Sequence, residues 1–140
     1  MSFREKSAWV TLITLIVLSI AFALHVPQPW TLRPASSPFM FHVLLLAIVA
    51  FVVIEVVAHV VIAIFSPRDA RAPKDERERL IELKSIAAAA YVYAFLSLSS
   101  VFTIHFGANQ IGVGYLILLS FIVAEIVNYA LRIYYYRRGF

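Results

Sequence analysis

The sequence contains no cysteine, which excludes disulfide bonds, thiolate metal sites and thiol catalysis. Glycine is also scarce: of the four glycines, Gly107, Gly112 and Gly114 surround one expected turn. No phosphate-binding loop, nucleophile elbow, dinucleotide fingerprint or HExxH pair occurs. The sequence therefore gives no positive support for an enzymatic function.

Charge is equally sparse, since 14% of the 140 residues are charged and 62% are hydrophobic. A soluble domain of this size needs more polar surface. The apolar residues gather in four runs, each near or above the roughly 20 residues that cross a bilayer as a helix. Backbone polar groups inside a bilayer need internal partners, so such runs form helices.

We therefore predict a single all-α transmembrane domain, residues 1–140, folded as an integral membrane four-helix bundle. The expected helices cover about residues 8–26, 39–65, 75–106 and 111–136. The third helix includes a cytoplasmic extension of about three turns before Lys84. Arg4, Lys6 and the following apolar run also resemble a signal peptide, but the run is longer than a usual signal core. We treat it as the first membrane helix.

The basic residues predict the orientation. Eleven of the twelve Lys and Arg residues lie on one side of the expected membrane, and only Arg33 lies on the other. The positive-inside rule places both termini and the central loop in the cytoplasm, as in a multi-pass protein of the inner (plasma) membrane. The net charge of +4 thus reflects topology, and we expect the lipid bilayer and no nucleic acid as a partner.

A weak internal repeat relates the two halves. The segment Val53–His59 matches Val123–Tyr129, with a glutamate at the same place in each. Lys6-Ser7 likewise matches Lys84-Ser85 at the start of the preceding helix. Two helical hairpins in the same orientation would be related by a pseudo-two-fold axis along the membrane normal. Chance similarity between apolar helices is the competing interpretation.

Two glutamates lie inside apolar runs and are the main candidates for a site. An ionisable group at this depth is expensive, so Glu55 and Glu125 should face the bundle interior. His59 shares a helix face with Glu55. A polar stripe on the last helix contains Glu125, Asn128, Tyr129, Arg132 and Tyr136. We expect the two glutamates to lie near one another and to share a proton.

This buried polar group has two open interpretations. It is either a proton, cation or small-substrate site formed by Glu55, His59, Glu125, Asn128, Tyr129 and Arg132, or a hydrogen-bond network that sets the register of the helices.

Three histidines form a second candidate site. His25, His42 and His105 fall at the expected outer ends of the first three helices, where they could converge on a metal or a haem. The alternative is that they are ordinary interfacial residues at helix ends. Neither an HxxxH nor an HxxE pair supports a ligand set, so we favour no cofactor.

The third helix contains two pairs of small residues four apart, Ser85 with Ala89 and Ala90 with Ala94. Such pairs let helices approach closely. We favour internal packing over a seam between two copies. A homodimer or a membrane-protein partner remains open.

The polar segment before the third helix carries a resemblance. Asp75-Glu76-Arg77 followed by Ile81 and Lys84 resembles the D-E-R-x-x-x-I-x-x-K motif of a family of small bacterial and archaeal multi-helix membrane proteins. The resemblance implies a membrane protein and supplies no catalytic residues. By its charges alone, the segment is a solvated, self-paired helix start.

Three classes of function follow. The leading one is a small transporter, channel-like or proton-coupled module that uses the buried glutamates. The second is a haem- or metal-binding membrane protein that uses the outer histidines. The third is a non-catalytic assembly or regulatory subunit whose Asp75–Lys84 segment meets a partner.

Overall fold

The computed structural model describes residues 3–25, 37–65, 67 and 73–138. These residues form α1 (Phe3–His25), α2 (Ser37–Phe65), α4 (Glu76–Phe102), the short 3₁₀ helix η3 (Thr103–Phe106) and α5 (Gln110–Arg138). Every regular element in this part of the chain is helical, which confirms the all-α prediction. Each of the four α-helices is long and apolar enough to cross a membrane.

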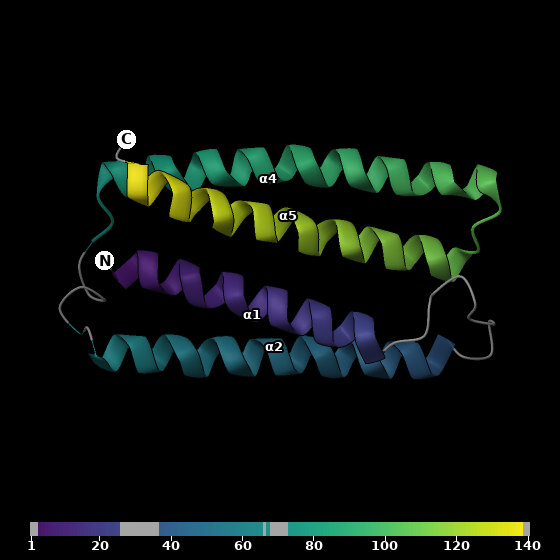
Figure 1. Cartoon of the computed structure of the whole chain (residues 1–140), viewed down its shortest axis with the longest axis horizontal. Coiled ribbons are helices and arrows are strands. Elements are labelled where there is room, and N and C mark those ends of the chain that lie inside the picture. Colours follow the sequence, from purple (N-terminus) through teal and green to yellow (C-terminus); the bar gives the residue numbers. More distant parts are fainter. Residues whose placement is uncertain (1–2, 26–36, 66, 68–72, 139–140) are drawn as a thin grey trace.

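The helices lie side by side in the order α2, α1, α5, α4, and neighbours run in opposite directions (Figure 1). The main packed pairs are α4 with α5, α1 with α5, and α1 with α2. The two hairpins therefore meet through α1 and α5, while α2 and α4 form the edges of the row. The predicted two-fold axis would pair α2 with α4 as it pairs α1 with α5, and the internal repeat stays a prediction.

The contact between α1 and α5 is the apolar centre of the molecule. Ala8 and Leu12 of α1 are buried against Ile133 of α5, and Trp9, Ile126 and Tyr129 pack around them. Most other large apolar side chains, including nearly all of those described on α2, remain exposed. An apolar exterior of this extent is what a helix surface in contact with lipid requires.

Small residues bring α4 and α5 together. Ser85 has no exposed surface, Ala89 is 6% exposed, and Ala124 of α5 is also buried. Of the two expected small-residue pairs, Ser85 with Ala89 thus lies inside the α4–α5 contact, whereas Ala90 and Ala94 are exposed. Close backbone approach accounts for the buried pair, since small side chains allow van der Waals contact between helices in lipid.

The ends of the helices differ slightly from the expected ranges. α1 begins at Phe3, before the expected start at residue 8, because its first turn is held by ion pairs to other helices. The third helix tightens into η3 and stops at Gly107, whose φ of 86° is left-handed and suits glycine. The connections 26–36 and 68–72 lie outside the described residues, as do Arg33, Arg68 and Arg71 within them.

The starts of α1 and α4 and the end of α5 lie at one end of the molecule, which we call the charged end (Figure 1). Arg4 of α1 forms an ion pair with Glu78 of α4. Arg137 of α5 lies 3.5 Å from Glu5 of α1, and its guanidinium also covers the Trp9 ring at 5.3 Å. Three chain segments are therefore joined by charge at this end.

Asp75 caps the first turn of α4. Its carboxylate accepts a hydrogen bond from the Glu76 amide at 2.7 Å, and Glu78 accepts one from the Asp75 amide at 3.2 Å, which completes a capping box. Replacing Asp75 by alanine removes this acceptor, and we expect the free energy of unfolding to fall by about 1 kcal/mol. Denaturant unfolding in detergent, followed by circular dichroism, measures the change. Asp75→Asn is the matched control, because asparagine also caps helices; an equal loss in both variants would contradict the capping role.

Candidate functional site

Glu55 and His59 of α2 face α1, where two hydroxyl groups meet them. Thr11 of α1, which is 4% exposed, donates a hydrogen bond to Glu55 Oε2 at 2.7 Å. His59 Nδ1 lies 3.4 Å from the same carboxylate oxygen. Ser7 and Thr11 are four residues apart on one face of α1, and this face contacts the ionisable pair of α2.

The imidazole of His59 is held at both nitrogens. Nδ1 lies 2.7 Å from the main-chain carbonyl oxygen of Glu55, and Nε2 lies 2.5 Å from Ser7 Oγ. A carbonyl only accepts, so Nδ1 carries a hydrogen, and in neutral imidazole the Ser7 hydroxyl donates to Nε2. In imidazolium both nitrogens donate, and the same hydroxyl can turn and accept. Ser7 therefore suits both charge states of His59.

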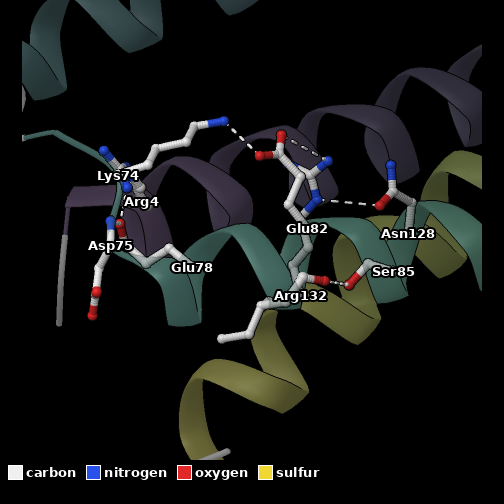
Figure 2. A network of polar contacts seen from close by, with 9 residues as sticks. Arg4, Lys74, Asp75, Glu78, Glu82, Ser85, Asn128 and Arg132 are labelled. Carbon is white, nitrogen blue, oxygen red and sulfur yellow. Dashed lines mark hydrogen bonds and ion pairs between the residues drawn. The ribbon is translucent and has the colours of Figure 1, made fainter.

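A second polar chain follows α5. Asn128, 5% exposed, donates from Nδ2 to Glu125 Oε2 at 3.1 Å and accepts at Oδ1 from Arg132 Nε at 3.1 Å. Arg132 also lies 3.6 Å from Glu82 Oε1 of α4, and Lys74 donates to Glu82 Oε2 at 2.5 Å (Figure 2). A continuous chain of hydrogen bonds and ion pairs thus leads from Glu125 along α5 to Glu82 and then to Lys74, at the start of α4.

A cavity of about 250 Å³ at the charged end joins the two chains. Five charged side chains line it: Arg4, Lys74, Glu78, Glu82 and Arg132. Ser7, whose hydroxyl lies against His59, also lines it. Arg132 also lines the cavity, and it belongs to the other polar chain, which leads to Glu125. Both polar chains therefore begin at the same cavity.

Tyr129 lies between the chains and also lines the cavity. The Arg132 guanidinium covers its ring at 5.0 Å, as a cation–π contact. Its phenol is close to Thr11 and within electrostatic range of both Glu55 and Glu125. Tyr129 therefore lies close to both polar chains.

The two glutamates, Glu55 and Glu125, form hydrogen bonds with different partners. Glu55 bonds to α1, whereas Glu125 bonds within α5, and α1 stands between α2 and α5 in the row. Among the described residues no hydrogen bond joins the two carboxylates directly. A shared proton between them stays a prediction, whereas the connection of both to one cavity is a property of the fold.

The histidines are placed apart. His42 is exposed near the start of α2, and His105 is exposed in η3, with its ring 6.4 Å from that of Phe102. These elements belong to opposite edges of the row. The side chain of His25 lies outside the described residues. Within the part of the chain that is described, no three His, Cys, Asp or Glu side chains form a group that could hold a metal ion.

Four lining residues were not expected in the site: Arg4, Lys74, Glu78 and Glu82. Glu78 and Glu82 belong to the segment Asp75–Lys84, which was predicted to be a solvated helix start. In the structure they form the walls of the cavity. A signal for this role was present: Glu78, Glu82, Ser85 and Ala89 follow one another at helical spacing, and the last two are small residues of the kind that face a neighbouring helix.

Comparison with known proteins gives no match to a family model, to a curated protein or to a solved structure. The resemblance carried by Asp75–Lys84 stays a prediction.

The hydrogen bond from Thr11 to Glu55 can be tested by removing its donor. Thr11→Val keeps the shape of the side chain but removes the hydrogen bond to the part-buried Glu55 Oε2, and we expect the free energy of unfolding to fall by about 1–3 kcal/mol. Equilibrium unfolding in mixed detergent measures it. Thr14→Val is the matched control, since Thr14 lies one turn further along α1 and makes no hydrogen bond to α2 among the described residues. Equal effects of the two substitutions would show that the bond contributes nothing specific.

Proposed function

We propose that the protein is a small proton-coupled transporter or channel-like module of the inner (plasma) membrane, with both termini in the cytoplasm. The observation that carries this proposal is the cavity from which two polar chains lead to Glu55 and to Glu125. A network that served only to set helix register would need no common opening. Ionisable groups within membrane helices typically mark ion and proton pathways.

The charged end supports the proposed orientation. The described basic residues at this end include Arg4, Lys74, Arg132, Arg137 and Arg138. Basic residues beside membrane helices favour the cytoplasmic side. The cavity would then open toward the cytoplasm and take up or release protons there.

The first chain has the parts of a proton path. A proton arriving in the cavity reaches the Ser7 hydroxyl, which lies 2.5 Å from His59 Nε2. His59 Nδ1 in turn lies 3.4 Å from Glu55 Oε2. Glu55 Oε1 is buried and has no hydrogen-bond partner among the described residues, so a proton taken up at Oε2 would remove the cost of a buried charge on this carboxylate. The half-open side chain of His59, 36% exposed, leaves it room to turn between its partners.

The second chain balances charge while the first one changes it. Arg132 links Glu82 on one side with Asn128 and Glu125 on the other. Its guanidinium remains protonated at all physiological pH values. The fixed positive charge of Arg132, beside Tyr129, would therefore offset the negative charge of Glu125. This offset would persist whether Glu55 gains or loses a proton.

The proposal predicts proton flux in reconstituted vesicles. With a pH-sensitive dye trapped inside and a pH step applied outside, the wild-type protein should move protons faster than empty vesicles do. Glu55→Gln keeps the size of the side chain and an acceptor for Thr11 but cannot exchange a proton, so the flux should fall to the level of protein-free vesicles.

Ser99→Ala is the control, because Ser99 is exposed on α4 and bonds to the Phe95 carbonyl of its own helix. It should retain the wild-type flux. Unchanged flux in Glu55→Gln, or wild-type flux no greater than that of empty vesicles, would reject the proposal. Thermal unfolding of each variant in detergent checks that the fold is kept.

A further inference from the structure

The charges around the cavity do not balance. Three cations line it, Arg4, Lys74 and Arg132, against two carboxylates, Glu78 and Glu82. Arg4 is paired with Glu78, so Glu82 is the lining carboxylate that pairs with both Lys74 and Arg132. Lys74 lies 2.5 Å from Glu82 Oε2, and Arg132 lies 3.6 Å from Oε1 (Figure 2). Among the side chains that line the cavity, one carboxylate bridging two cations leaves an excess of one positive charge, since Glu125 lies beyond Asn128 and does not line it.

The excess charge lies in a partly sheltered place. The side chains of Arg132 and Glu82 are 20% and 30% exposed, whereas Lys74 at the mouth of the site is 48% exposed. Charges withdrawn from water in this way attract an opposite charge more strongly than surface charges do. Arg4 is also within electrostatic range of Glu82, so all three cations act on the same small region.

The size and the other lining groups narrow the class of ligand. A cavity of about 250 Å³ lies below the roughly 300–1,000 Å³ of pockets for drug-sized ligands, so it suits a small group. Tyr136 lines the cavity, and a tyrosine hydroxyl can donate a hydrogen bond. Arginine presents a planar fork of donors that matches phosphate oxygens, and lysine adds a point charge.

We propose that this cavity binds a phosphate-bearing anion between Lys74 and Arg132. The ligand would take over the bridging position that Glu82 occupies, with Glu82 turning away from one or both cations. The site goes beyond the proposed proton function, because it requires no proton transfer. The phosphate can belong to a free anion or to the headgroup of an anionic lipid, since basic pockets between membrane helices bind such headgroups.

The direction in which Glu82→Gln changes the affinity for the ligand distinguishes this site from a structural ion network. If the three charges only hold α4 on α5, Glu82→Gln weakens the structure and creates no affinity. If Glu82 competes with a ligand, Glu82→Gln removes a like charge and tightens binding. Lys74→Gln and Arg132→Gln should do the reverse in the ligand-binding case.

The experiment is isothermal titration calorimetry on delipidated full-length protein in a non-ionic detergent at low ionic strength. The probes are inorganic phosphate, dihexanoyl phosphatidylglycerol and, as a headgroup without net charge, dihexanoyl phosphatidylcholine. We expect saturable binding of inorganic phosphate or of phosphatidylglycerol and none of phosphatidylcholine. Lys74→Gln and Arg132→Gln should each weaken binding about tenfold, and Glu82→Gln should strengthen it about tenfold.

Arg138→Gln is the matched control, since Arg138 belongs to α5 and covers the Tyr134 ring at 5.0 Å but does not line the cavity. It should bind as the wild type does. Binding of phosphate alone identifies a free anion, whereas binding of phosphatidylglycerol, with or without competition by phosphate, identifies a lipid headgroup.

Three results would overturn the site: no saturable binding of either anionic probe, an equal loss in Arg138→Gln, or weaker binding in Glu82→Gln. Lys74 lies outside the helices, in the segment just before α4, so Lys74→Gln keeps the test decisive if Arg132→Gln does not fold.

Discussion

An ionisable side chain on an apolar helix must find a polar partner on the helix beside it, and the rest of this structure depends on how that requirement is met. The Thr11 hydroxyl meets Glu55, and the Ser7 hydroxyl meets His59. These two bonds join α2 to α1 at a surface where few other side chains are buried. Since each unsatisfied polar group in hydrocarbon costs several kcal/mol, this match determines which face α2 presents to its neighbour.

Ion pairs and charged hydrogen bonds join the other helices in the same way. Arg132 reaches Glu82 on α4 and Asn128 on its own helix, and Arg4 joins α1 to α4 through Glu78. The charged end thus holds three helices through groups that would be solvated if they stood alone. The cavity lies among these groups.

Much of this arrangement could be predicted. The four helices followed from the length of the apolar runs, and Glu55, His59, Asn128 and Arg132 were expected to make polar contacts because of their positions within those runs. The small-residue pair Ser85 and Ala89 was expected to pack internally, and it lies between α4 and α5. Each of these predictions depended on spacing along one helix, which the periodicity of the α-helix makes readable.

The sequence by itself determined that the chain is helical, that its helices are long and apolar enough to cross a membrane, and that a few ionisable residues lie within them, because each follows from composition and local spacing. Only the tertiary structure decided the row α2–α1–α5–α4, the different hydrogen-bond partners of Glu55 and Glu125, and the place of Glu78 and Glu82 in a cavity wall. Spacing along a helix says which residues share a face, but the partner of that face depends on how all four helices pack.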